Sequence, residues 1–373
     1  MSKDFLQRYK VHLKTIGPVF IGSGQEIGKR EWILDRRSRT GYIIDELKLF
    51  NYLNKKNLLE SYEKYMLKDN RDLYRWASDN GLFPDNMKTV IKYTLDCNDV
   101  SNVNTMKSIK TFIKDAYGKP YVPGSSVKGA LRNVILEKFI ATQHNKLIEK
   151  KIIDSAMGVN IKNPKTYLKG ESNQLITQYL RILERNNEKK GDAVNDIMSG
   201  LRISDSKPLE FSDLTLCQKV DVNVAGNERD MPIFRECIKP GTDIEFDLTI
   251  DTMILNISIQ DIEDAIVLAL DNYNNEFLSK FESEELYQGN VIYIGGGAGY
   301  HTKTATSVVL ENYDNKVNVT ANIINNTIAS KMRKEHGHAA DKRIGVSPHI
   351  VKLTEYDGKL MQFGPCRISF EEI

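Results

Sequence analysis

Short strand-like runs separated by long helical stretches limit what this chain can fold into more than any other feature of the sequence. Residues Tyr9 to Ile16 alternate apolar and polar side chains, which is typical of a half-buried strand. Trp32-Ile33-Leu34 and Tyr42-Ile43-Ile44 flank a basic turn and predict a β-hairpin. From Glu46 to about Asn80 the apolar spacing is helical. This irregular order indicates an α+β fold and not a repeating βαβ fold.

The same irregular order continues through the rest of the sequence. A helix is expected directly after Pro123-Gly124, and a longer helix from about Ser258 to Phe281. A turn at Tyr356-Asp357-Gly358-Lys359 predicts a final hairpin. The remaining strand-like runs lie at residues 90–95, 109–113, 201–204, 214–224, 233–238, 244–250, 350–354 and 361–368.

The length of 373 residues fits two packed units, or one core with large insertions. Hydrophobic residues make up 40% of the chain and charged residues 27%, so a globular protein is expected. The stretch from about residue 145 to 200 is polar and rich in Lys and Asn, and we place the domain boundary there. We predict an N-terminal unit, residues 1–190, with helical insertions at about 46–80 and 145–190, and a C-terminal unit, residues 191–373.

The composition also excludes several classes of protein. The four cysteines are scattered and form no CxxC pair, so the sequence indicates neither a disulfide framework nor a zinc knuckle. No window reaches the roughly 18 apolar residues of a membrane span. His336, His338 and His349 match no HExxH or Cys/His ligand spacing. We therefore expect a cytoplasmic protein with no membrane segment, no metal site and no cofactor.

The first segment that could carry function spans residues 117–132. Ser125 or Ser126 could cap the helix that begins there, and a helix N-terminus attracts anions. Lys128 and Arg132 are four residues apart, so they lie on one face of that helix and could clasp successive phosphates. The alternative is an ordinary surface helix with two solvated cations.

The second segment spans residues 295–304 and has four glycines in its first five positions. Glycine allows backbone N–H groups to approach a ligand closely. Tyr300 offers a stacking face, His301 a donor that can switch with pH, and Lys303 a positive charge. This combination predicts a site for single-stranded nucleic acid, and the alternative is a flexible loop. The glycines are Gly295, Gly296, Gly297 and Gly299.

The third segment, residues 17–39, combines small residues with a basic run. Small residues would let RNA pass near the backbone, while the cations would hold phosphates or stack on bases. The alternative is a tight turn followed by a solvated basic hairpin. The candidate RNA-binding residues are Gly22, Ser23, Gly24, Lys29, Arg30, Arg36 and Arg37.

Catalytic groupings are poorer than these binding segments. His12, on the first predicted strand, is a weak candidate for a general base in RNA cleavage, which would also need a second acid or base and a nearby cation. A surface or packing histidine is the alternative. Asp205-Ser206 could hydrogen-bond RNA or form a turn at the end of a strand.

The three glycine-bearing segments, which follow one another in the chain at residues 17–39, 117–132 and 295–304, resemble those of the RAMP superfamily. The segments that resemble general RAMP motifs are residues 13–18, 21–24, 121–132 and 201–206. The late segment 295–304, with Phe363-Gly364-Pro365-Cys366, narrows the resemblance to the family of fifth Csm subunits of type III-A CRISPR effector complexes. Together these segments span nearly the whole chain, and the insertions between them carry no recognisable motif.

This resemblance implies a ferredoxin-like core, similar to an RNA-recognition motif, with the glycine-rich segments along a bound guide RNA. It implies a non-catalytic subunit that caps the 3′ end of the guide RNA (crRNA) and is required for maturation of that end in antiviral and anti-plasmid defence. The implied partners are the guide RNA, other Csm subunits, especially the RAMP backbone subunit, a host nuclease that trims the guide and, indirectly, the target RNA. The alternative functions are a metal-independent endoribonuclease that processes guide RNA through His12 and His301, and a pure protein-interaction scaffold.

Overall fold

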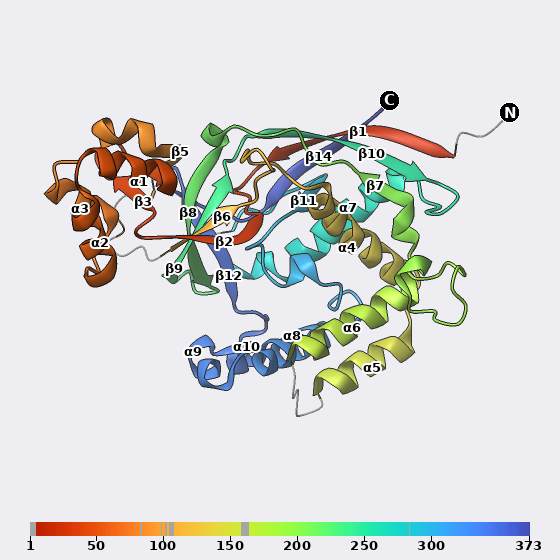
Figure 1. Ribbon diagram of the computed structural model, residues 1–373. Helices are drawn as coiled ribbons and strands as arrows, with labels where there is room; N and C mark the ends of the chain where they lie inside the picture. The colour runs from red at the N-terminus through yellow and green to blue at the C-terminus, as the bar shows by residue number, and fades with distance from the viewer. Residues whose placement is uncertain are drawn as a thin grey trace.

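Two β-sheets with helices packed around them form the centre of the molecule (Figure 1). The structure is a computed structural model that describes residues 5–82, 84–97, 99–100, 103, 108–157, 164–282 and 284–373. The first sheet has five strands in the order β11-β14-β1-β10-β7, and every neighbouring pair is antiparallel. Its strands are β1 (Leu6–Thr15), β7 (Leu201–Ile203), β10 (Asp243–Asp251), β11 (Val291–Tyr293) and β14 (Pro365–Glu372).

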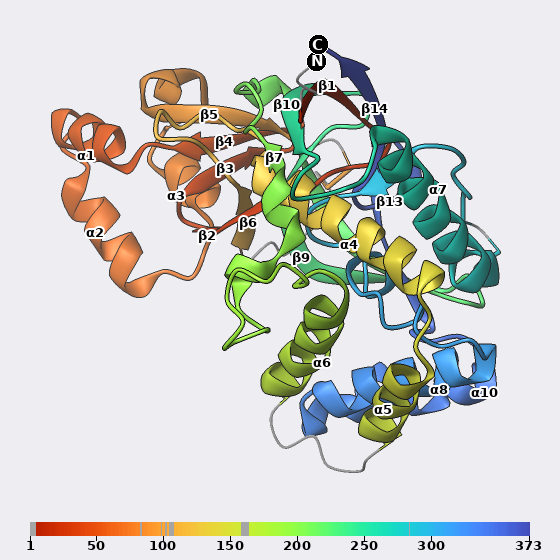
Figure 2. The same ribbon diagram turned by 90° about the vertical axis from the view of Figure 1, so that its right-hand side faces the viewer.

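The first sheet and two helices form a ferredoxin-like core. Helices α4 (Gly124–Thr142) and α7 (Ile259–Glu276) pack on each other and on the strands of this sheet (Figure 2). The chain order β1-α4-β7-β10-α7-β14 is βαββαβ, and the spatial order β14-β1-β10-β7 places the fourth strand beside the first. Strand β11 is an additional strand at the edge. The predicted α+β, ferredoxin-like fold is confirmed.

The sequence of each core element explains its place. Strand β1 buries every second side chain, including Tyr9, Val11 and Leu13, because successive residues of a strand point to opposite faces. Helix α7 starts with a capping box in which the Ser258 hydroxyl accepts from the Asp261 N–H at 3.1 Å and the Asp261 carboxylate accepts from the Ser258 N–H at 3.0 Å. Lys138 of α4 then donates to Asp261 at 3.0 Å and joins the two helices.

The second sheet is built from insertions into the connections of this core. Its strands follow the order β2-β6-β9-β8-β5-β4-β3, and β12 pairs with β8 and with β13. These strands are β2 (Gly22–Gly28), β3 (Trp32–Asp35), β4 (Thr40–Ile44), β5 (Ile91–Asp96), β6 (Ser108–Phe112), β8 (Leu214–Asn223), β9 (Glu228–Ile238), β12 (Ile350–Tyr356) and β13 (Lys359–Gln362).

Two groups of helices are inserted as well, and they lie at different ends of the molecule (Figures 1 and 2). The first group lies in residues 46–79, where the apolar spacing is helical, and the second includes one helix, α8, that was not predicted. Among the described residues, no helix is long and apolar enough to cross a membrane. The inserted helices are α1 (Glu46–Lys55), α2 (Leu59–Lys68), α3 (Leu73–Asp79), α5 (Lys146–Met157), α6 (Pro164–Tyr179) and α8 (Tyr313–Thr327).

The predicted strand at 361–368 is in fact two strands in different sheets. Strand β13 forms the expected hairpin with β12, whereas β14 joins the first sheet between β1 and β11. The chain crosses between the sheets at Gly364, which has φ +89° and where an added Cβ would lie 2.4 Å from the Ile294 carbonyl oxygen. In the first sheet, β1 precedes residue 190 and lies between β14 and β10, which follow it. The division of the chain at residue 190 stays a prediction.

A fully buried carboxylate joins three strands of the second sheet. Glu236 of β9 is 0% exposed, accepts from the Phe112 N–H of β6 at 2.8 Å and pairs with Lys114 at 2.7 Å. The Tyr93 hydroxyl of β5 donates to the same carboxylate. A buried charge is tolerated when it is paired and hydrogen-bonded in this way.

We predict that Glu236→Ala lowers the free energy of unfolding by about 3 to 5 kcal/mol, because it leaves the charge of Lys114 and the N–H of Phe112 without their partner. Urea unfolding followed by circular dichroism measures this loss. Glu228→Ala, on the exposed part of the same strand, should change the free energy by less than about 0.5 kcal/mol. Equal losses for the two variants would contradict the structural role of Glu236.

Candidate nucleic-acid interface

The N-terminus of helix α4 is held by a carboxylate of the chain itself. The helix is capped at Pro123 with no side-chain hydrogen bond, so neither Ser125 nor Ser126 caps it as predicted. The first free N–H, that of Gly124, donates instead to Asp205 Oδ1 at 2.8 Å. The Ser206 hydroxyl accepts from the Val122 N–H at 2.9 Å. Asp205-Ser206 therefore fixes the start of this helix against the end of β7, and the predicted anion position is partly filled.

The two cations of α4 also have partners within the chain. Lys128 donates to the Leu201 carbonyl oxygen at 2.6 Å, and burial lowers the pKa of its ammonium group. Arg132 forms an ion pair with Asp196. Both cations therefore use part of their hydrogen-bonding capacity within the chain, and their contact with phosphates stays a prediction. Their partners come from residues 196–201, which no local sequence pattern connects to α4.

The glycine-rich segment owes part of its composition to close packing. A Cβ added to Gly295, which has φ +73°, would lie 2.3 Å from the Phe20 carbonyl oxygen. A Cβ on Gly297, at φ +106°, would lie 2.9 Å from the Phe363 ring. Residue types other than glycine are therefore excluded at both positions. Gly299, at φ +102°, has open space beside it, and Tyr300 packs against the main core.

His301 is a structural group and not the pH-sensitive donor that the sequence predicts. Its Nε2 donates to the Ser347 carbonyl oxygen at 2.8 Å, and its ring centroid lies 4.8 Å from that of Phe277. Burial lowers the pKa of His301 to about 4, although the hydrogen bond to Ser347 acts in the opposite direction. The imidazole is therefore neutral at physiological pH.

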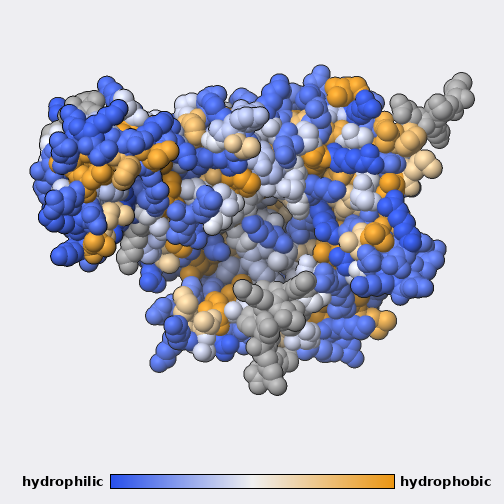
Figure 3. Space-filling view, viewed as in Figure 1, coloured by the Kyte–Doolittle hydropathy of each residue, from blue (hydrophilic) through white to orange (hydrophobic). Residues whose placement is uncertain are grey.

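All three predicted segments contribute to one groove of about 490 Å³ between α4, α6, the start of β2 and the glycine-rich segment. The space-filling view, from the same side as Figure 1, shows a hollow near the middle of the molecule (Figure 3). Arg132 and Lys303 are the cations that line the groove, and none of its described lining residues is a carboxylate. The predicted residues that meet there are Gly22, Ser125, Ser126, Arg132, Gly295, Gly296 and Lys303. The lining residues that the sequence did not indicate include Gly129, Asn133, Ser172 and Thr302.

Two lining side chains present polar atoms that have no partner in the described part of the chain. The Thr302 hydroxyl and the Arg132 Nε are buried and make no hydrogen bond there. Buried polar groups in native proteins are nearly always paired, so each such atom requires an explanation. Both atoms lie beneath the surface of the groove, so a ligand could pair with them only after a local shift of the lining side chains.

The basic residues of the third predicted segment lie elsewhere. Strands β2 and β3 are at opposite ends of the strand order of the second sheet, so Arg36 and Arg37, which follow β3, are not part of the groove. Lys29 donates to the Asn70 carbonyl and Arg30 to the Met66 carbonyl, so both hold the helical insertion α2–α3 against the sheet. Ser23 and Gly24 follow Gly22 in β2, where the Ser23 hydroxyl lies 2.5 Å from that of Thr111.

Two clusters in the described residues have side chains of the kinds that bind metals: His338, Asp341 and His349, and His144, Glu149 and Glu311. Neither cluster lines the groove. His12 lies on the exposed face of β1, with Glu245 at 3.7 Å and Glu371 at 3.3 Å. Both of these neighbouring side chains are acidic.

A family model described as the RAMP superfamily matches residues 12–300. The chain belongs to the RAMP superfamily. The resemblance inferred from the glycine-bearing segments is thereby confirmed, and residues of the segments 21–24, 121–132 and 295–304 line the groove.

Relatives of this RAMP protein carry one name. The chain is 27% identical, over 392 residues and 98% of each chain, to the "CRISPR system Cms protein Csm5" of Mycobacterium tuberculosis strain CDC 1551 / Oshkosh. It is also 27% identical over 325 residues to the protein of that name from Streptococcus thermophilus, covering 82% of this chain and 81% of the relative. The predicted resemblance to the fifth Csm subunit is borne out by these relatives.

Solved structures share the RAMP fold. A chain in the cryo-EM structure of a Csm-crRNA-target RNA ternary complex of a type III-A CRISPR-Cas system has a TM-score of 0.64 at 21% identity, with 97% of this chain and 100% of that chain covered. The crystal structure of T. onnurineus Csm5 has a TM-score of 0.57 at 21% identity, covering 80% and 93%. At 21% identity, the likeness to these two structures shows a shared fold and nothing further.

We predict that His301 makes the protein less stable as the pH falls from about 6.5 to 4. A histidine in the unfolded chain has a pKa near 6.5, so in this window the unfolded state binds the additional proton and is favoured. Urea unfolding at pH 7, 6 and 5 should show a shallower loss for His301→Gln than for the unsubstituted protein. Identical slopes for His301→Gln and the unsubstituted protein would contradict the prediction.

Proposed function

We propose that this chain is an RNA-binding subunit of a type III-A CRISPR effector complex that works in the cytoplasm and caps the 3′ end of the guide RNA. It is required for maturation of that end, and a separate host nuclease cuts the RNA. Its partners are the guide RNA and the other Csm subunits, especially the RAMP backbone subunit, and it meets the target RNA only through the complex.

The observation that carries this proposal is the meeting of three sequence-distant glycine-bearing segments on one groove. The start of β2, the first turns of α4 and the segment after β11 all present small side chains there. Small side chains allow an RNA backbone to approach the protein backbone. The likeness to Csm5 proteins, and to a chain solved within a Csm-crRNA-target RNA complex, supports RNA as the ligand.

The charges and free polar atoms of the groove also favour an RNA ligand. Lys303 is exposed and the Arg132 side chain is 32% exposed, while no described lining residue is acidic. Phosphate oxygens accept hydrogen bonds from ammonium and guanidinium groups. Asn133 and the serines add neutral polar groups that suit sugar hydroxyls.

The proposed absence of a catalytic role rests on the two histidines that RNA cleavage would use. His12 lies between the carboxylates of Glu245 and Glu371, which repel a phosphate. The lysines on either side of it, Lys10 and Lys14, form ion pairs with Asp247 and Asp243. His301 is half-buried and donates to a backbone carbonyl. The geometry therefore supports binding and not cleavage.

We expect RNA binding to weaken with salt. If about four to six phosphates are neutralised, the logarithm of the affinity should fall with the logarithm of the salt concentration at a slope of about −3 to −4 for a single strand. Fluorescence anisotropy with a labelled single-stranded RNA measures this slope. The RNA should remain uncut on a denaturing gel of the same samples. A flat salt response would contradict the proposal.

Gly129 offers a clean test of the groove. It lies on the exposed face of α4, and a Cβ added to it would meet no described atom within 4 Å. We predict that Gly129→Glu weakens RNA binding at least about tenfold, or about 1.4 kcal/mol, because it places a negative charge in the groove. Lys128 and Arg132 are less suitable, since their substitution also breaks internal contacts.

The matched control is Gly129→Ala, which should stabilise the helix by about 0.5 to 1 kcal/mol and leave RNA affinity within about a factor of two. Thermal unfolding confirms that both variants are folded. Unchanged affinity in Gly129→Glu would show that RNA, if bound, does not use this groove.

A further inference from the structure

The segment between α8 and β12 has an unusual interior. It consists of α9 (Arg333–His336), the 3₁₀ turn His338–Ala340 and α10 (Asp341–Ile344), each of three or four residues. Polar and ionisable side chains are rarely buried unless something pairs them, and here they outnumber apolar ones. Val346 anchors the segment in a hydrophobic cluster with Phe277 and Phe281, and the other buried side chains are polar. Its buried residues are His338, Asp341, Val346 and Ser347.

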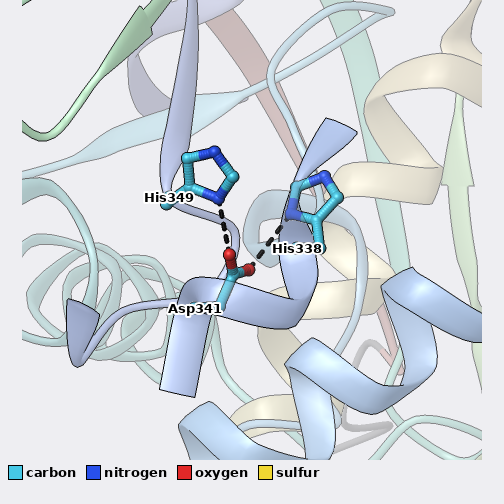
Figure 4. Close-up of side chains that lie close together, drawn as sticks. All are labelled: His338, Asp341 and His349. Atoms are coloured by element: carbon cyan, nitrogen blue, oxygen red, sulfur yellow. Dashed lines mark hydrogen bonds and ion pairs between the residues drawn. The ribbon is translucent and has the colours of Figure 1, made fainter. Parts of the chain in front are cut away.

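The Asp341 carboxylate is the centre of this interior. It is 0% exposed, and its Oδ1 accepts from His349 Nδ1 at 2.5 Å. Its other oxygen accepts from His338 Nδ1 at 3.1 Å and from the Ser347 hydroxyl at 2.7 Å. Figure 4 shows both imidazole rings directed at the carboxylate from different parts of the chain. Gly345, with φ +85°, turns the chain back so that His349 reaches it.

The ligand atoms of these three residues fit one metal ion. Two imidazole nitrogens and a carboxylate oxygen are the ligands that zinc and related divalent ions prefer. One ligand atom from each residue lies within 4.8 Å of the other two. Ligands of one tetrahedral ion stand about 3.4 Å apart, given bonds of about 2.0 to 2.2 Å. The 3.1 Å between His338 and Asp341 is close to this spacing, and the 2.5 Å to His349 would lengthen by about 1 Å.

The hydrogen bonds of both histidines are compatible with metal binding. Each ring directs its Nδ1 at the Asp341 carboxylate, and a ring that donates there carries a proton on Nδ1. An ion would need the lone pair of that nitrogen, so the ring would then carry its proton on Nε2. A metal ion would thus take the place of the two hydrogen bonds to Asp341.

We propose that His338, Asp341 and His349 bind a divalent transition-metal ion, such as zinc, that cross-links residues 338–349. The ion fixes Ser347, whose hydroxyl bonds to Asp341 and whose carbonyl oxygen accepts from His301. His301 precedes Thr302 and Lys303 of the groove, so the metal site supports one wall of it. The site itself does not depend on the proposed RNA-binding function.

The second cluster provides a matched control within the same chain. His144 lies 3.4 Å from Glu149 and 3.2 Å from Glu311, but the Glu311 side chain is 61% exposed. Exposed acidic groups near a histidine are common without an ion. We assign no metal to this cluster.

Zinc content tests the proposal directly. The full-length protein is stripped with a chelator, reloaded with Zn²⁺, dialysed and analysed by mass spectrometry for metal. We expect about one zinc ion per chain. His144→Ala should retain it, and the double variant with His338→Ala and His349→Ala should lose it. No retained zinc, or equal retention in the double variant, would overturn the proposal and leave a His-Asp-His hydrogen-bond network.

Cobalt spectroscopy tests the proposed metal site without requiring that the double variant with His338→Ala and His349→Ala be folded. Co²⁺ replaces zinc, and His349→Cys adds a thiolate ligand at the site. A sulfur-to-cobalt charge-transfer band should appear in His349→Cys and be absent from the unsubstituted protein and from His144→Cys. The lack of this band in a folded His349→Cys protein would overturn the assignment of residue 349 as a ligand.

Discussion

The second sheet depends on the buried carboxylate of Glu236. Strand β5 meets β8 at a single register position, and β6 meets β9 at two, so few ladder hydrogen bonds hold these strands. Glu236 replaces the missing bonds by binding Tyr93, Phe112 and Lys114 together. Because β2 pairs with β6, this carboxylate also sets the position of Gly22 on the groove. The ion pair and hydrogen bonds of Glu236, deep in the second sheet, therefore help to shape a groove that is formed largely by elements outside that sheet.

The pattern of strands and helices could be predicted because it depends on local periodicity. The alternation in β1, the hairpin β3–β4 and the inserted helices α1 to α3 are all visible in short windows of sequence. The division of residues 361–368 between two sheets was not predicted, because both parts read as strands in a short window of sequence and their partners are set by tertiary packing, including that of Gly364 against Ile294. Helix α8 was missed because its many Asn residues weaken the helical signal.

The candidate site was predictable in its segments and not in its contacts. The glycines correctly indicated where chain segments approach each other. Gly295 and Gly297, however, are needed because a Cβ there would clash with Phe20 and Phe363, whatever ligand binds. The partners of Lys128 and Arg132 lie in residues 196–201, beyond the reach of any spacing rule. The metal-ligand cluster was missed for a similar reason, since the spacing of His338 and His349 has meaning only once Asp341 is seen between them.

The place of β14 has a consequence for how the protein is made. Strand β1 lies between β10 and β14, and Tyr9 faces Glu372 across the sheet. A ribosome that has completed β1 must therefore synthesise the chain as far as residues 365–372 before that strand gains both neighbours. Until then β1 has an open edge, which is prone to pair with strands of other molecules. Pairing between strands so far apart in the sequence slows folding.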